Sequence, residues 1–278
     1  MFRWKKRALP GLGLTLGTTG VYLALIVLLP VAALLMKAAS LSPSEFFAII
    51  SSPRALASFR VTLSAAFYAT IFNGVFGLLL AWIIVRYEFP GRRLLDALVD
   101  LPFALPTAVA GIALTALFSR NGMIGQYLEP LGIKIAYAPA GIALAMAFTS
   151  LPFIVRSVQP VLEDIDIATE EAGRSLGASD LVIFLRVIFP AILPAFLAGC
   201  TLGFARSLGE FGAVIFIAGN LPLQTEITAL LIFIRLEEFD YQAAAAYATV
   251  LLIMAFALMF VTNLIQMWQL RYTKKADA

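Results

Sequence analysis

The chain has 278 residues, a net charge of +3, and a composition that is 61% hydrophobic and only 13% charged. Ordinary soluble domains are about 45–50% apolar and about 25% charged, so this composition predicts a membrane protein. Histidine is absent and Cys200 is the only cysteine, which excludes disulfide frameworks, Cys/His metal sites and histidine-dependent catalysis.

Six stretches are apolar and long enough to cross a bilayer, which takes about 20 residues. They are residues 14–36, 60–85, 97–119, 138–158, 194–218 and 243–267. The first follows a basic N-terminus but is longer than the apolar core of a signal peptide, so we expect a retained span. The sequence therefore predicts an all-α polytopic membrane protein with one domain of six transmembrane helices, over residues 14–267.

The basic residues concentrate on one side of the predicted membrane. Segments 1–13, 86–96, 159–193 and 268–278, counted with Arg156, hold 13 of the 20 lysines and arginines. The positive-inside rule makes these segments cytoplasmic, so both the N-terminus and the C-terminal tail are expected in the cytoplasm. The opposite loops are too short to hold a folded domain, so external capture of a ligand would need another polypeptide.

The cytoplasmic loop 159–193 contains the polar stretch EEAGRSLGASDLVIFLRVIFP. Asp164 or Asp166 can cap a first helix, in which Glu170 and Glu171 come early, where the helix dipole favours acids. Arg174 lies four residues after Glu170, an order that supports an exposed helix.

Gly177 follows this helix and can adopt the left-handed conformation that ends it. Ser179 can cap a second helix over residues 180–188, which Pro190 is expected to end. The spacing thus predicts two short helices joined by a sharp turn. An ordinary interfacial link between two spans is an equally good interpretation of this pattern.

The same stretch resembles the EAA loop of ABC-transporter permeases, which reads E-A-A, three residues, G, nine residues, I-x-L-P. Here residues 171–173, Gly177 and residues 187–190 follow that order, with conservative departures at three positions (Gly for the second Ala, Val for Ile, Phe for Leu). The resemblance implies that residues 164–190 dock on an ATPase subunit, the small Ala172/Gly173 face allowing close approach. It assigns ATPase coupling to Glu170, Glu171, Ala172, Gly173, Gly177, Ala178 and Pro190.

Longer segments, at 73–114, 145–163, 206–220 and 236–246, look like the T-type permease subunit of bacterial sulfate/thiosulfate importers. This resemblance implies a type I ABC importer permease in the bacterial inner membrane. Its implied partners are a second homologous permease, two ATPase subunits and a periplasmic or lipid-anchored sulfate-binding protein. The motif RSLGEFGA is similar in molybdate and sulfate permeases, so it narrows the substrate to a tetrahedral oxyanion and leaves molybdate or tungstate as the alternative.

No G-x-x-x-x-G-K-[ST] sequence occurs, so the chain lacks a Walker A phosphate cradle. We expect a transporter subunit that is not an enzyme and binds no cofactor or metal, with ATP and Mg²⁺ held by the partner ATPase. An autonomous channel or an ion-gradient-driven transporter is the competing class, and it would transport without ATP when expressed alone.

Polar residues and prolines interrupt two of the predicted spans. Arg206 and Glu210 lie four residues apart in the fifth span, and a charge at the centre of a span costs roughly 2.5–3.5 kcal/mol. They are expected to form either a structural ion pair or the lining of an anion path. Prolines at the start of the third span predict a bend beside that path or a simple packing kink. The candidate pathway residues are Arg206, Ser207, Glu210, Pro102, Pro106 and Thr107.

Overall fold

The computed structural model describes the backbone of residues 12–276 and the side chains of residues 13–264. The predicted cytoplasmic N-terminus therefore lies almost entirely outside the described residues, and the predicted tail is described by its backbone alone, up to residue 276. The described part of the chain consists of helices and loops, without a strand. The α-helices are α1 (Leu12–Leu23), α2 (Leu29–Ala39), α3 (Pro43–Ile50), α4 (Pro53–Arg86), α5 (Arg92–Val99), α6 (Leu101–Ala104), α7 (Thr107–Phe118), α8 (Gly125–Leu128), α9 (Pro139–Asp164), α10 (Ile167–Ser175), α11 (Asp180–Ile183), α12 (Phe189–Leu208), α13 (Val214–Ile217), α14 (Thr228–Glu237) and α15 (Tyr241–Ala276). Two π-helical turns, η1 (Ala24–Leu28) and η3 (Phe184–Ile188), and a 3₁₀ turn, η2 (Glu129–Leu131), complete the set.

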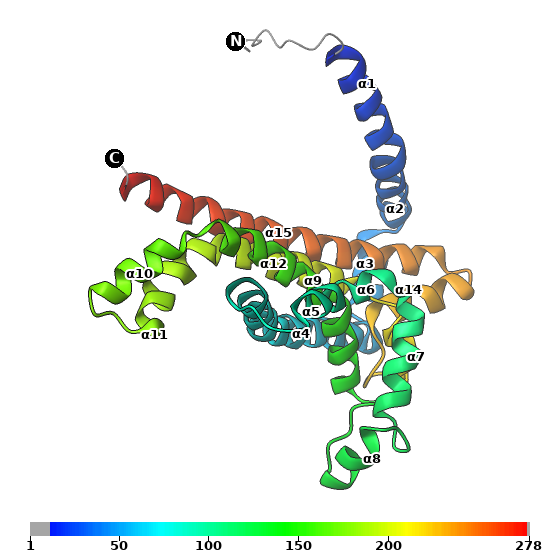
Figure 1. Cartoon of the computed structure of the whole chain (residues 1–278). Coiled ribbons are helices and arrows are strands. Elements are labelled where there is room, and N and C mark those ends of the chain that lie inside the picture. The colour runs from blue at the N-terminus through cyan, green and yellow to red at the C-terminus, as the bar shows by residue number, and fades with distance from the viewer. Residues whose placement is uncertain (1–11, 277–278) are drawn as a thin grey trace.

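The long helices form a bundle, with α10 and α11 beyond one end and α3 and α14 near the other (Figure 1). Among the described residues, five helical stretches are long and apolar enough to cross a membrane: 13–39, 53–86, 139–164, 180–208 and 241–264. They correspond to all the predicted spans except the third, which is divided among α5, α6 and α7. The count of six spans and the cytoplasmic placement of both termini therefore stay predictions.

The break in the third predicted span has a local cause. A residue that precedes a proline disfavours the helical conformation, and Leu105, before Pro106, is extended with a ψ of 134°. Accordingly, α6 ends at Ala104 and α7 begins at Thr107. Pro102 lies in the first turn of α6, where a missing N–H breaks no helical hydrogen bond.

The fifth predicted span, 194–218, lies nearer the N-terminus than expected, because helical structure runs from Asp180 to Leu208. The expectation that Pro190 ends the second hairpin helix is wrong. Instead, α11 continues into α12 through the π-helical turn η3, in which the Phe189 N–H donates to the carbonyl of Phe184. This wider turn relieves the clash that a proline ring makes with the preceding turn of a regular α-helix.

Small residues set the spacing of α4, α9 and α12, which form the centre of the bundle. A Cβ on Gly77 of α4 would lie 3.2 Å from Cγ2 of Ile154 in α9, and one on Gly199 of α12 would lie 2.9 Å from the Ile154 Cα. The fully buried Asn73 of α4 donates to the carbonyl of Ala147 in α9 at 2.8 Å. These contacts let the three helices approach closely and fix their register.

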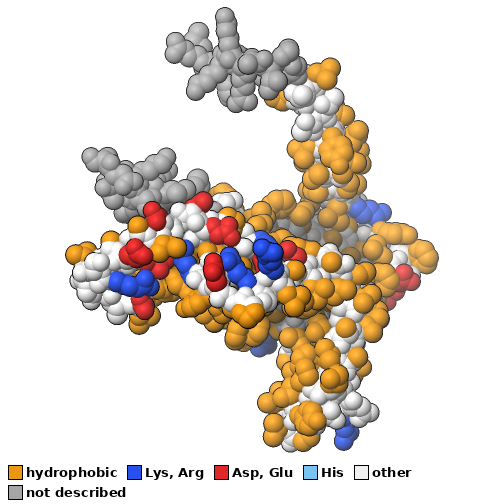
Figure 2. Space-filling model, in the orientation of Figure 1, with side chains coloured by type: hydrophobic (Ala, Val, Ile, Leu, Met, Phe, Trp, Pro, Cys, Tyr) orange, Lys and Arg blue, Asp and Glu red, His pale blue; other side chains and the backbone are white. Residues whose placement is uncertain are grey.

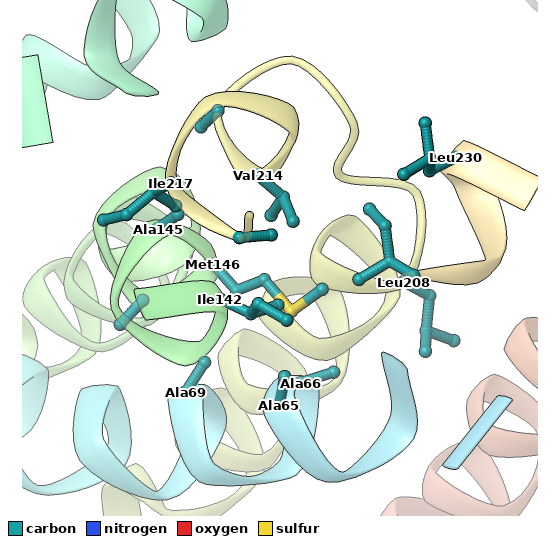
Figure 3. Close-up of a cluster of buried hydrophobic side chains, with 14 of the residues drawn as sticks. Ala65, Ala66, Ala69, Ile142, Ala145, Met146, Leu208, Val214, Ile217 and Leu230 are labelled. Carbon is teal, nitrogen blue, oxygen red and sulfur yellow. The ribbon is translucent and has the colours of Figure 1, made fainter. Parts of the chain in front are cut away.

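A hydrophobic cluster joins this centre to the short helix α13. Figure 3 shows Ala65 and Ala69 of α4 facing Met146 of α9, with Val214 and Ile217 of α13 on the other side of the cluster. Because α13 follows α12 in the chain, the cluster fastens the loop after the fifth span to the second and fourth spans. That loop contains the candidate pathway residue Glu210.

The segment α1–η1–α2 projects from the bundle, which it contacts where α2 meets α15 (Figure 1). Large apolar side chains such as Leu14, Val21 and Leu25 are exposed along it. Figure 2 shows apolar side chains along the visible face of this segment, whereas charged side chains gather over α10 and α11 and toward the middle of the bundle. The exposed apolar residues of the segment include the consecutive run from Leu25 to Leu29, so they cover every side of the helix. A helix that is apolar on every side is expected to meet lipid or other membrane helices.

Candidate functional site

The predicted coupling hairpin consists of α10, α11 and the turn that joins them. Gly177 in this turn has a φ of 83°, in the left-handed region. Its N–H donates to the carbonyl of Arg174 at 2.9 Å, and the N–H of Ala178 donates to the carbonyl of Gly173 at 3.1 Å. These two bonds are the Schellman motif that ends many helices. The sharp glycine turn predicted at Gly177 is therefore confirmed.

The start of α10 also follows the predicted capping pattern. Asp166 is the N-cap residue, and its carboxylate accepts a hydrogen bond from the Ala168 N–H at 3.0 Å. The other candidate cap, Asp164, is instead the last residue of α9. Ser179 occupies the N-cap position of α11 but makes no side-chain capping bond.

Gly173 brings the two hairpin helices together. A Cβ at this position would lie 3.0 Å from Cγ1 of Ile183 in α11. Ile183 is buried in a hydrophobic cluster that also contains Ile84 of α4 and Leu162 of α9. The family resemblance implies that the small Ala172/Gly173 face allows a partner protein to approach closely. In the structure, Gly173 allows close approach of α11 of the same chain.

A buried ion pair attaches the hairpin to the transmembrane bundle. Nη2 of Arg86, at the end of α4, lies 2.9 Å from Oε1 of Glu170 in the first turn of α10, and both side chains are about one-tenth exposed. Arg86 also donates to the carbonyl of Ile165, just before α10, at 3.2 Å. The sequence pattern does not reveal this pair, because its members lie 84 residues apart and share no local spacing.

Arg174, the predicted partner of Glu170, contributes much less to this attachment. Its guanidinium lies 3.8 Å from Glu170 and 2.9 Å from the exposed Asp180, whose hydrogen bond raises the pKa of Arg174. Exposed ion pairs contribute about 0–1 kcal/mol, whereas removing one partner of a buried pair costs about 3–5 kcal/mol. Removing one partner of the Arg86–Glu170 pair is therefore expected to loosen α10 more than removing Arg174.

The remaining predicted coupling residues lie at the surface or near it. Glu171 and Ala172 are exposed on α10, and Ala178 is half-buried after the turn. Pro190 is exposed in the first turn of α12. Leu176, at the tip of the hairpin, has 89% of its surface exposed. An apolar side chain this exposed at the tip of a charged hairpin is suited to insertion into a partner.

The candidate pathway residues of the fifth span form an ion pair. Nη1 of Arg206 lies 2.7 Å from Oε2 of Glu210, which is 1% exposed, and Oε1 of Glu210 accepts a hydrogen bond from the Ala213 N–H at 3.0 Å. The helix ends at Leu208, so Glu210 reaches Arg206 through the turn that follows and not from the same helix face. Ser207 is buried, and its hydroxyl donates to the carbonyl of Gly203 at 2.9 Å.

The candidate residues of the third span meet those of the fifth. The side chain of Thr107, at the start of α7, touches Gly212, where a Cβ would overlap its hydroxyl oxygen. A Cβ on Gly111, one turn further along α7, would overlap the backbone of Ala213. The structure thus brings Thr107 beside the loop that carries Glu210, whereas Pro102 is buried in α6.

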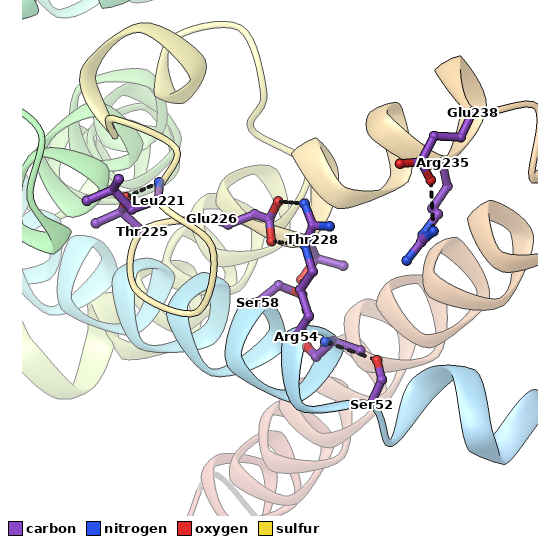
Figure 4. A network of polar contacts seen from close by, with 10 residues as sticks. Ser52, Arg54, Ser58, Leu221, Thr225, Glu226, Thr228, Arg235 and Glu238 are labelled. Atoms are coloured by element: carbon purple, nitrogen blue, oxygen red, sulfur yellow. Dashed lines mark hydrogen bonds and ion pairs between the residues drawn. The ribbon is translucent and has the colours of Figure 1, made fainter.

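Three further ion pairs, made by two arginines, were not anticipated from the sequence. Arg156 of α9 bonds to Asp100 at 2.6 Å and to Asp96 at 2.5 Å, so it ties α5 and the start of α6 to the bundle. At the other end, Arg54 makes a two-pronged contact with the buried Glu226, at 2.6 and 2.8 Å, beside Ser58 and Thr228 (Figure 4). Charged residues next to predicted spans indicated that ion pairs were needed there. Sequence spacing could not show which residues pair, because the partners are far apart in the chain.

A family model described as "Binding-protein-dependent transport system inner membrane component" matches residues 73–275 of the chain. The chain belongs to this family. It is therefore a membrane permease, as the composition and the sequence motifs predict. Its membrane is the inner membrane, which the chain crosses several times.

Curated relatives match nearly the whole permease. It is 56% identical to the sulfate transport system permease protein CysT of Salmonella typhimurium, over 94% of each chain. It is 48% identical to the protein of the same name from Synechocystis, over 91% of this chain and 89% of the relative. The resemblance to sulfate permeases that the sequence motifs indicate is confirmed.

Solved structures share the permease's fold. A bacterial alginate ABC transporter, in complex with an alginate pentasaccharide-bound periplasmic protein, matches with a TM-score of 0.74, covering 91% of this chain and 92% of that one at 17% identity. The MetNI methionine ABC transporter, in an inward-facing conformation, matches with a TM-score of 0.59 at 17% identity, covering 79% and 99%. The fold is that of a type I ABC importer permease, as expected.

The neighbouring acids Glu170 and Glu171 provide a matched test of the hairpin attachment. Glu170→Gln should loosen α10, because it leaves the buried Arg86 without its counter-charge, a change that costs about 3–5 kcal/mol. Glu171→Gln, one residue on and exposed, should have little effect. Hydrogen exchange of residues 167–188 in the assembled complex measures this difference. Equal exchange in the two variants would show that the ion pair does not hold the hairpin.

Proposed function

We propose that this permease carries sulfate, and thiosulfate with it, into the cytoplasm as a membrane subunit of an ATP-driven, binding-protein-dependent importer. The observation that carries the substrate assignment is the 56% identity to a sulfate permease over 94% of both chains. The molybdate alternative rests on the single shared motif RSLGEFGA, at residues 206–213. Similarity along the whole chain outweighs one motif.

The coupling hairpin supports a separate ATPase as the source of energy. Its exposed tip, with Leu176 beside Glu171 and Ala172, offers a small apolar and acidic surface for a groove on the ATPase. ATP and Mg²⁺ would be bound there and not by this chain. Displacement of the hairpin would reach α4 through Arg86 and Glu170, and α9 and α12 through the close contacts at Gly77 and Gly199.

The other proposed partners are a second homologous permease and an external sulfate-binding protein. Exposed apolar side chains on α5–α7, including Leu94, Leu98 and Phe103, provide a surface that another membrane subunit would cover. The two permeases would enclose the path between them, so that ATP-driven rocking exposes it to each side in turn. The binding protein would deliver sulfate to the external opening.

Arg206 is the proposed contact for the anion within this path. Its side chain is 36% exposed, while its partner Glu210 is 1% exposed. The guanidinium is therefore bound by Glu210 on one side and remains accessible to an anion on the other. Partial neutralisation by Glu210 weakens any anion contact. Weak contact suits transport, since a tightly bound ion would be released slowly.

Labelled-sulfate uptake tests the proposed substrate directly. Cells that lack the chain should regain uptake when it is restored, and unlabelled sulfate or thiosulfate should compete far better than molybdate at equal excess. Loss of the ATPase subunit should abolish uptake, which separates an ABC importer from an autonomous transporter. Competition by molybdate as strong as that by sulfate would contradict the sulfate assignment.

Gly177→Val should uncouple ATP hydrolysis from transport. A β-branched residue is strained at a φ of 83°, so the Schellman turn should open and displace the tip of the hairpin. Sulfate-stimulated ATP hydrolysis by the reconstituted complex should fall strongly, and Gly177→Asn, which tolerates this conformation, should retain most of it.

Gly91, with a φ of 91° and no neighbour within 4 Å, is the matched control, because it lies in a different loop. Gly91→Val introduces the same kind of strain outside the hairpin. Normal coupling in an assembled Gly177→Val complex, or an equal loss in Gly91→Val, would count against the proposed role of the hairpin.

A further inference from the structure

An open groove runs between α4 and α9 near the end of the bundle where both helices begin. Its volume is about 1040 Å³. On α4 it follows one helix face from Pro53 to Phe72, and on α9 it follows the small residues from Pro139 to Ala147. Ala65 and Ala69, drawn in Figure 3, lie at the boundary between this groove and the hydrophobic cluster beneath it.

Arg60 is the one charged residue that lines this groove. It is exposed, and it stands near the mouth, two turns into α4, roughly 10 Å from the first residue of the helix. The other arginines in helices of this half of the bundle have carboxylate partners: Arg54 with Glu226, Arg206 with Glu210 and Arg235 with Glu238. None of the ion pairs among the described residues includes Arg60.

Polar side chains continue inward from Arg60 along the same face of α4. Ser64 and Tyr68 follow at intervals of four residues, so they lie on the same helix face as Arg60. Each of these three positions is about 6 Å from the next along the helix axis. Both are exposed to the groove, and Gln224 adds an amide at its rim. Arginine and tyrosine are hydrogen-bond donors, and the rest of the lining is mostly apolar. The Ser64 hydroxyl donates to the Val61 carbonyl at 3.2 Å, so it would exchange this bond for one to an anion.

A guanidinium among apolar walls attracts an anion more strongly than one in open water, because the local dielectric constant is lower. Sulfate is a dianion that accepts hydrogen bonds but donates none, so it matches this row of donors. We infer that Arg60 receives the transported oxyanion at the mouth of the α4–α9 groove and passes it toward Ser64 and Tyr68. This inference rests on the proposed sulfate transport and adds an external contact residue to it.

The first test is uptake by the complete importer, with its binding protein and ATPases, reconstituted in vesicles. Arg60→Gln should lower labelled-sulfate uptake per assembled complex by roughly tenfold, the lower limit for losing a hydrogen bond to a charged group. Arg60→Lys should recover much of the rate. Arg120→Gln is the matched control, because Arg120 is exposed, has no ion-pair partner among the described residues and lies outside the groove.

Lipid phosphate is the other oxyanion that Arg60 could meet at this depth. The uptake comparison is therefore repeated in vesicles made of galactolipids, which carry no phosphate. A tenfold difference between wild type and Arg60→Gln in both kinds of vesicle supports the inference. A difference that vanishes in galactolipid vesicles assigns Arg60 to a lipid headgroup and overturns it, as does equal uptake by the two proteins in phospholipid vesicles.

A second measurement reports on the groove even if Arg60→Gln assembles poorly. In a Cys200→Ala background, Ser64→Cys supplies a thiol one turn from Arg60. Anionic methanethiosulfonate reagents should modify it faster than cationic ones, and sulfate should slow the anionic reagent. Equal rates for the two reagents, with no protection by sulfate, would contradict an anion site. If the wild-type complex imports no sulfate at all, the proposed function fails first, independently of Arg60.

Discussion

The buried contact between Arg86 and Glu170 is the interaction on which the proposed coupling of this permease would depend. It joins the last residue of a long transmembrane helix to the first turn of the hairpin that is proposed to meet the ATPase. In a low-dielectric setting each of these charges stabilises the other and would be costly alone. The surface pair Arg174–Asp180 stiffens the hairpin internally, but it provides no comparable attachment to the bundle.

Rigid packing extends this attachment through the membrane. Gly77 and Gly199 bring α4, α9 and α12 into close contact at Ile154, and the buried Asn73 fixes α4 against α9. Arg156 adds α5 and α6 through Asp96 and Asp100. A displacement at the hairpin would therefore reach a group of helices and not a single one, as the proposed alternation between two open states requires.

Local features of the fold were predictable from the sequence where the governing interaction is itself local. The cap at Asp166, the left-handed turn at Gly177 and the pairing of Arg206 with Glu210 each involve residues within a few positions of one another. Pro190 shows the limit of such rules, because a π-helical turn just before it accommodates the proline and the helix continues. The third predicted span shows the same limit. Its composition predicts one continuous helix, but Pro106 divides it between α6 and α7.

Long-range partners were not predictable in this way. Arg86 and Glu170, Arg156 and Asp100, and Arg54 and Glu226 are separated by 84, 56 and 172 residues, and no spacing rule connects them. Gly173 illustrates the same limit. A small residue indicates that another element packs closely against it, but the sequence does not show which element this is. The sequence thus predicted a coupling role for Glu170, and the structure shows that Glu170 is held by Arg86, a residue that the sequence did not single out.

The central claim is that the hairpin and α4 move as one body during the ATP cycle. Spin labels at Ile71→Cys on α4 and Leu181→Cys on α11, both exposed positions, can report the distance between the two elements in a Cys200→Ala background. Pulsed electron paramagnetic resonance on the assembled importer, nucleotide-free and then trapped with ATP, measures this distance in both states. The account predicts the same distance distribution in each state. A distribution that shifts when ATP binds would show that the hairpin moves independently of α4 and would contradict it.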